Sequence, residues 1–156
     1  MEPSETDSVV LHASSRWWNK IDLRRDQTPW ITFPRWGKGF SLDGKDYTVA
    51  RRGRVGAFEL SQAGESIVAV QSRGGLLSEA FEFDYAGKQW AMKKAGVLSV
   101  GANLECAGQI VGELRTPQGF YFGRRHDARL PRELPDVIQV FLIWMYINSI
   151  GVNTST

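Results

Sequence analysis

The sequence predicts a mainly β protein: a closed antiparallel barrel of about twelve strands that encloses a hydrophobic C-terminal helix. Three observations support this prediction. From Lys45 onward, short runs alternate between apolar and polar residues, which is typical of half-buried strands. Glycine-containing turns recur about every nine to twelve residues, the spacing of an antiparallel meander. Between Val137 and Ile150, only Gln139, Asn148 and Ser149 interrupt an apolar run.

The composition fits one cytoplasmic domain. The chain has 156 residues and a formal net charge of +2, which is too weak to indicate a dedicated nucleic-acid binder. Its single cysteine, Cys106, excludes an internal disulfide and a cysteine-based zinc site, so we interpret it as a buried thiol. Residues 1–15 are polar and show no signal-peptide pattern, and we expect them to form a disordered tail. Residues 16–152 then form a single barrel domain.

Aromatic and basic residues alternate in the next segment, between Trp17 and Phe40. The aromatic residues are Trp17, Trp18, Trp30, Phe33, Trp36 and Phe40, and the basic ones are Lys20, Arg24, Arg25, Arg35 and Lys38. One interpretation is a stacking and phosphate-binding surface for nucleic acid or lipid headgroups. The other, which we favour, is that the rings belong to the core of a small domain.

The strand-like runs then follow one another along the chain. They comprise Tyr47 and Val49, Phe58 and Leu60, Phe81 to Tyr85, Trp90 and Met92, Leu104 to Cys106, Ile110 to Leu114, and Phe120 to Phe122. With one or two more strands between Trp17 and Phe33, the total is about ten to twelve, enough for a barrel with room for a helix.

The pattern changes after Arg129. Prolines and acids between Leu130 and Asp136 suit the start of a helix, which we place at about residues 134–151. Because no face of this helix is polar, it must be buried by protein or by lipid. About 20 apolar residues are needed to cross a bilayer, so we favour burial inside the barrel and expect no transmembrane span.

Several segments together resemble one known family. They are the hairpin YTVARRGRVGAFELSQAGESIVAV, the hairpin FEFDYAGKQWAMKK, the strand GQIVGELR and a hydrophobic helix after DARLPRELPDV. This layout resembles the tubby C-terminal-like superfamily, which includes the plant LURP-one-related proteins and the phospholipid scramblases. The resemblance covers about residues 45–152 and implies a closed barrel around a central C-terminal helix.

The resemblance also implies possible ligands. Tubby-type members bind phosphoinositides through a basic strand surface, and scramblase-like members are associated with calcium and membrane lipids. In this chain the acids before the last helix are Asp127, Glu133 and Asp136, which lack the spacing of a calcium loop. We therefore carry over neither calcium nor scrambling.

Three basic clusters at the expected strand ends are candidate anion-binding residues. They are Arg51, Arg52 and Arg54; Lys93 and Lys94; and Arg124 and Arg125. If their turns share one rim of the barrel, they form a site for a phosphorylated headgroup. The alternative is that basic side chains simply keep the turns solvated.

The sequence predicts no catalytic residue, metal site or cofactor. No serine lies in a nucleophile-elbow motif, His126 has no motif that links it to a nucleophile, and Glu82 and Asp84 fall on the solvent side of a strand. We therefore predict a non-enzymatic binding module for anionic phospholipid headgroups or a protein partner, cytoplasmic or peripheral at a membrane. The alternatives are a tail-anchored, scramblase-like membrane protein and, more weakly, an enzyme that uses the barrel mouth.

Overall fold

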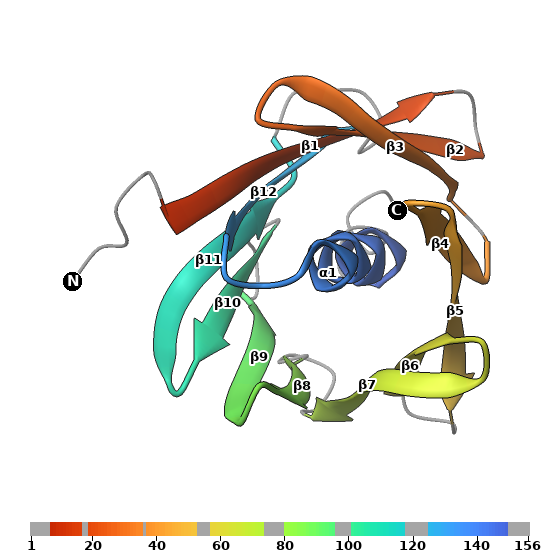
Figure 1. The fold of residues 1–156 in the computed structure, drawn as a ribbon. Helices are drawn as coiled ribbons and strands as arrows, with labels where there is room; N and C mark the ends of the chain where they lie inside the picture. The colour runs from red at the N-terminus through yellow and green to blue at the C-terminus, as the bar shows by residue number, and fades with distance from the viewer. Residues whose placement is uncertain are drawn as a thin grey trace.

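The computed structural model describes residues 7–16, 19–35, 37–52, 57–73, 80–95, 101–117 and 125–149. The described residues form twelve strands and one helix (Figure 1). The elements are β1 (Ser8–Arg16), β2 (Lys20–Arg25), β3 (Thr28–Pro34), β4 (Gly39–Leu42), β5 (Lys45–Arg52), β6 (Ala57–Gln62), β7 (Glu65–Arg73), β8 (Ala80–Tyr85), β9 (Lys88–Lys94), β10 (Gly101–Cys106), β11 (Gln109–Arg115), β12 (Arg125–Pro131) and α1 (Asp136–Asn148).

All twelve strands belong to one antiparallel sheet that curls into a nearly closed barrel. The strand order is β3-β2-β1-β12-β11-β10-β9-β8-β7-β6-β5-β4, so every neighbour follows in sequence except β1 and β12. That pair joins the two ends of the chain, with Ser8 opposite Pro131 and Ser14 opposite Arg125. The ends of the sheet, β3 and β4, lie beside each other without ladder pairing between their described residues.

The expectation of a disordered tail over residues 1–15 is wrong for residues 8–15. These residues form most of β1, which is hydrogen-bonded on both sides, to β2 and to β12. Val9, Leu11 and Ala13 are buried, whereas Val10 and His12 between them and Ser14 after them face outward. The strand is stabilised by a partner strand more than one hundred residues away in the sequence.

The helix α1 lies in the middle of the barrel, as Figure 1 shows in a view along its axis. Every residue from Ile138 to Ile147 is buried, including Gln139. The Gln139 side chain donates a hydrogen bond from Nε2 to the Leu134 carbonyl at 2.8 Å, which offsets part of the cost of burying its amide, whose Oε1 has no hydrogen-bond partner among the described residues. The predicted helix of about residues 134–151 is correct in place and burial, but its first turn begins two residues later, at Asp136.

Alternate residues of the strands point inward to meet the helix. Phe33 and Phe40 belong to this core, as the favoured interpretation of the aromatic segment predicts, and Trp30 packs against it. Trp17, Trp18 and Trp36 lie outside the described residues. No helix in the described part of the chain is both long and apolar enough to cross a membrane.

Candidate functional site: the basic end of the barrel

The two ends of the barrel differ in their connections. Because neighbouring strands are antiparallel, successive connections alternate between the ends. The two-residue turns Asp26-Gln27, Asp43-Gly44, Ala63-Gly64, Ala86-Gly87 and Ala107-Gly108 all fall at one end, together with the start of α1. We call this the tight-turn end. Both residues of each of these five turns have positive φ, the geometry that suits two-residue hairpins.

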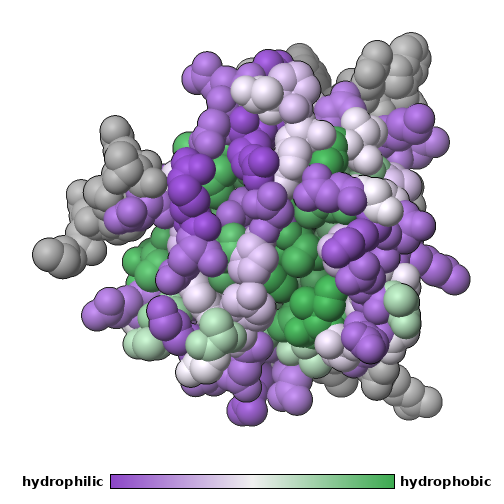
Figure 2. All heavy atoms as spheres, in the orientation of Figure 1, coloured by the Kyte–Doolittle hydropathy of each residue, from purple (hydrophilic) through white to green (hydrophobic). Residues whose placement is uncertain are grey.

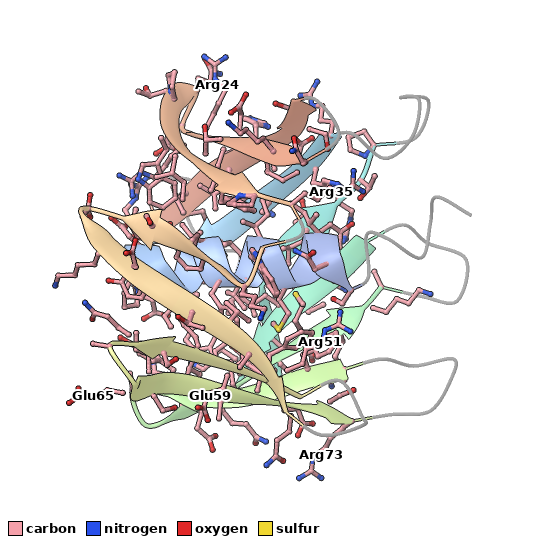
Figure 3. The ribbon with its side chains drawn as sticks, turned by 90° about the vertical axis from the view of Figure 1, so that its right-hand side faces the viewer. Arg24, Arg35, Arg51, Glu59, Glu65 and Arg73 are labelled. Carbon is pink, nitrogen blue, oxygen red and sulfur yellow. The ribbon has the colours of Figure 1, made fainter. Side chains whose placement is uncertain are left out.

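The opposite end is strongly basic. The last two residues of each strand at this end, with the described residues directly beyond them, include no aspartate or glutamate. The basic residues there are Arg16, Lys20, Arg35, Lys38, Arg51, Arg52, Arg73, Lys93, Lys94, Arg115 and Arg125. We call this the basic end. In Figure 3, Arg35, Arg51 and Arg73 lie toward this end, on the right, whereas Arg24 and Glu65 lie toward the tight-turn end.

Acidic groups collect at the tight-turn end instead. They are Asp7, Asp26, Asp43, Asp46, Glu65, Asp84, Glu105, Glu133 and Asp136, mixed with Arg24, Arg25, Lys45, Lys88 and Arg132. Figure 2, which views this end, shows hydrophobic side chains near its centre surrounded by hydrophilic ones. The charges of the described residues are therefore separated along the barrel axis, although the formal net charge of the whole chain is only +2.

All three predicted clusters reach the basic end. Arg51, Lys93, Lys94 and Arg125 lie there with their side chains described, and Arg52 is the last residue of β5. The side chain of Arg52 lies outside the described part of the structure, as do Arg54 and Arg124 as whole residues. The sequence could not show that these turns share a rim.

The side chains at the basic end point in two directions. Arg51 and Lys94 continue the inward-facing sets of β5 and β9, because they follow the buried residues Val49 and Met92 by two positions. Arg73 and Lys93 are on the outward faces of β7 and β9, with 67% and 52% of their side chains exposed. The cations therefore surround both the mouth and the outer edge of the barrel.

The outward-facing cations have carboxylate partners. Arg73 Nε lies 2.9 Å from Glu82 Oε2, and Lys93 Nζ lies 3.0 Å from Glu105 Oε2. Arg125 Nε lies 3.5 Å from Asp127 Oδ1. Ion pairs this exposed contribute about 0–1 kcal/mol each, so a phosphate group can compete for the same cations.

Some lysines at the basic end have no carboxylate partner among the described residues. Lys38 and Lys94 form no ion pair with a residue that the structure describes. Arg115 is the opposite case, because it donates hydrogen bonds to the carbonyls of Ala102 and Leu114 and to the amide oxygen of Asn103. Arg115 therefore acts as a structural cation, whereas Lys38 and Lys94 are the cations best placed to meet a ligand.

A chain of ring contacts connects the rim to the helix. The Arg51 guanidinium lies 5.4 Å from the ring centroid of Phe58, directly opposite it on β6. Phe58 in turn meets Trp144 of α1 edge-on, with ring centroids 6.0 Å apart. The cation is thus held over the end of the core by an aromatic side chain rather than by a carboxylate.

A buried polar cluster lies inside the barrel below this rim. Thr116 Oγ1 is 2.8 Å from His126 Nδ1 and 2.8 Å from Tyr146 Oη, so one hydroxyl joins two strands' ends to the helix. Burial raises the pKa of Tyr146 above 10.0, although the hydrogen bond with Thr116 and the charge of Arg115 act in the opposite direction. All three side chains are buried and out of reach of a substrate. We therefore interpret the cluster as hydrogen bonding that holds the helix to the strands, not as a reaction centre.

Sequence reasoning missed several members of the site. Arg35 and Lys38 were assigned to the aromatic segment, and Arg73 was not singled out. A usable signal was nevertheless present: the tight turns recur at every second connection, so the connections between them must share the other end. The Thr116, His126 and Tyr146 cluster has no comparable signal, because its members lie up to 30 residues apart.

The carboxylates before the helix are not brought together. Asp127 contacts His12 Nδ1 at 2.6 Å, Glu133 pairs with Lys88 at 3.6 Å, and Asp136 pairs with Arg25 at 2.9 Å. Glu82, between the buried Phe81 and Phe83, and Asp84, after Phe83, face outward as predicted. Cys106 packs against the hydrophobic core but is only partly buried, so the prediction of a buried thiol is confirmed only in part.

Comparisons with protein-family models, with curated proteins and with solved structures found no match. The fold and the basic end are therefore the grounds on which a function can be proposed.

Proposed function

We propose that this chain is a tubby-like, non-enzymatic binding module whose basic end attaches to anionic phospholipid headgroups at a membrane surface. The observation that carries the proposal is the separation of charge along the barrel: cations at the ends of seven strands, with Arg35 and Lys38 just beyond two others, lie at one end, and the described strand termini there carry no acid. The twelve-stranded barrel with its C-terminal helix supports the tubby-like assignment, because that is the architecture the resemblance implies.

The physical basis is electrostatic. Each lysine or arginine near an anionic bilayer contributes about 1 kcal/mol to binding, and the contribution falls off within a Debye length of about 10 Å. Cations spread around a ring meet several headgroups at once, whereas scattered cations on different faces do not. The module would bind with the barrel end on the membrane and the acidic tight-turn end directed away from it.

The geometry of the helix terminus bears on the alternative explanation that the cations only neutralise the helix dipole. The carboxyl end of α1 points to the basic end, where its partial negative charge would attract cations. However, the last turn is satisfied from within: the Asn148 side chain donates to the Trp144 carbonyl at 2.9 Å, and the Ser149 hydroxyl donates to the Met145 carbonyl. The cations are thus not needed as caps for these carbonyls.

Vesicle flotation tests the proposal. The full chain should float with phosphatidylcholine vesicles that contain phosphatidylserine or a phosphoinositide, and should not float with phosphatidylcholine alone. Raising the salt to about 0.5 M should release it, since the Debye length then shortens to a few ångströms. If the protein binds neither kind of anionic vesicle at low salt, the proposal is wrong. The basic end would then suit an acidic protein partner.

A further inference from the structure

The tight-turn end of the barrel is a partly open apolar surface. Among the described residues, the apolar side chains that pack against the core while staying partly exposed gather near this end. They lie within four residues of a tight turn or in the first turn of α1, and they are Trp30, Ile31, Tyr47, Ile67, Tyr85, Cys106, Val111 and Val137. Hydrophobic side chains accordingly lie near the centre of this end in Figure 2, inside a hydrophilic border.

Three β-bulges contribute residues to this apolar surface. The pairing shifts just after the tight turn in the hairpins β2–β3, β6–β7 and β10–β11. Each time, the additional residue is the third of the second strand: Trp30, Ile67 and Val111. In the strand order, β3, β11 and β7 are four strands apart, so the bulges are spread around the whole end. The apolar surface is therefore a regular feature of the fold, because a bulge changes the direction of a side chain.

Carboxylates without a charged partner border this surface. Asp43, Glu65 and Asp84 are exposed and lie in or beside three successive tight turns. They form no ion pair with a residue that the structure describes. Glu65 lies at this end in Figure 3. The described residues of the whole tight-turn end include nine carboxylates and only five cations, so this end is negative where the basic end is positive.

These charges decide how two copies of the chain can meet. Two tight-turn ends would bring negative charge against negative charge, and two basic ends would bring positive charge against positive charge. A tight-turn end against a basic end instead pairs opposite charges. Lysine and arginine also suit the apolar surface, because their aliphatic stems can cover it while the charged groups reach the carboxylates at its border.

We propose that the chain associates with itself head to tail, with the tight-turn end of one copy on the basic end of the next. Because two different surfaces meet, each complex keeps one free end of each kind, and longer assemblies grow as the concentration rises. The contact uses the same basic end as the proposed membrane attachment but does not require a membrane. Self-association and vesicle binding therefore compete for Lys38 and Lys94.

Sedimentation velocity of the full chain, without vesicles, tests this proposal. At low salt, the weight-average sedimentation coefficient should rise with protein concentration. About 0.5 M salt should abolish this rise, because the Debye length then shortens to a few ångströms. The triple variant Asp43→Asn/Glu65→Gln/Asp84→Asn and the double variant Lys38→Gln/Lys94→Gln should each associate about tenfold or more weakly than wild type. The three acids are exposed, so the triple variant should unfold at the wild-type temperature.

A mixture of the two variants tests the direction of the contact. The triple variant keeps its basic end, and the double variant keeps its tight-turn end. An equimolar mixture should therefore associate as strongly as wild type but stop at one-to-one complexes, because the ends that remain free are the substituted ones.

Three results would each overturn the proposal. They are a wild type that stays monomeric at low salt up to about 1 mM, association that only one of the two variants weakens, and no gain of association in the mixture. Flotation with vesicles is measured separately, so the two proposals can fail independently. Vesicle binding without self-association would refute only the head-to-tail contact, and self-association without vesicle binding would refute only the membrane attachment.

Discussion

Thr116 Oγ1 and Tyr146 Oη lie 2.8 Å apart inside the barrel, and their hydrogen bond joins the end of β11 to the last turns of the central helix. The Tyr146 ring also meets the His126 ring edge-on, at a centroid distance of 5.8 Å. These contacts fix the helix terminus directly below the basic end. The position of the rim thus depends on the same helix that fills the core.

Because of the Tyr146 hydroxyl, we expect the free energy of unfolding to depend on pH in the alkaline range. Because burial raises the pKa of this group in the folded protein, the unfolded chain loses its proton first as the pH rises through 10.0. Stability from this group is therefore full below pH 10 and declines above it, by at most about 1.4 kcal/mol per pH unit. Urea unfolding of wild type and Tyr146→Phe between neutral and alkaline pH checks this.

The substitution should cost about 1 kcal/mol at neutral pH, since Thr116 loses one partner and keeps His126. Above pH 10, the free energy of unfolding should fall less steeply in Tyr146→Phe than in wild type. Parallel curves would show that Tyr146 does not carry the pH dependence.

Removal of the helix should unfold the barrel. Ten consecutive residues of α1 are buried, and a buried Leu, Ile, Phe or Met side chain contributes about 1.5–3 kcal/mol. Their sum exceeds the total stability of a typical domain, about 5–15 kcal/mol. A chain that ends at Pro135 should show no cooperative thermal transition by circular dichroism, whereas one that lacks only residues 153–156 serves as the control. A folded, cooperative barrel without the helix would contradict its role as core.

Gly39 should be irreplaceable at the start of β4. A Cβ atom there would lie 1.9 Å from the Tyr47 carbonyl oxygen, on the strand with which β4 pairs. Gly39→Ala should therefore lower the free energy of unfolding by more than about 3 kcal/mol. Gly64→Ala is a matched comparison, because Gly64 has φ +82° in an open turn with no atom within 4 Å of the new Cβ. It should cost only about 1–2 kcal/mol, and equal losses in chemical denaturation would refute the steric explanation.

Local pattern was sufficient to predict the barrel and its helix. Alternation such as Phe81, Phe83 and Tyr85 against Glu82 and Asp84 identifies half-buried strands, and the apolar run after Pro135 identifies the only segment able to fill the lumen. The strand β1 was missed because its apolar residues, Val9, Leu11 and Ala13, are small in number and follow a polar start. Its partner β12 lies at the other end of the sequence, so no local signal indicates that pairing.

The candidate site was predictable only in part. The sequence identified Arg51, Lys93, Lys94 and Arg125 as residues at strand ends, but their meeting at one end depends on the number of strands between them. Because β1 and β4 were not assigned individually, the alternation of connections between the two ends of the barrel could not be followed from strand to strand. Lys38 was not identified as a residue at a strand end for a related reason. The strand that begins just after it, β4, is only four residues long and was not recognised in the sequence.

The most direct test of membrane attachment compares two matched pairs of lysines. Lys38 and Lys94 lie at the basic end, whereas Lys45 and Lys88 lie at the tight-turn end, so Lys38→Gln/Lys94→Gln and Lys45→Gln/Lys88→Gln remove equal charge from opposite ends. In flotation with phosphatidylserine vesicles at low salt, the first variant should bind about tenfold or more weakly than wild type, at about 1 kcal/mol per lysine. The second should bind like wild type. Both variants should unfold at the wild-type temperature. Equal weakening by the two variants, or none by either, would contradict an oriented attachment through the basic end.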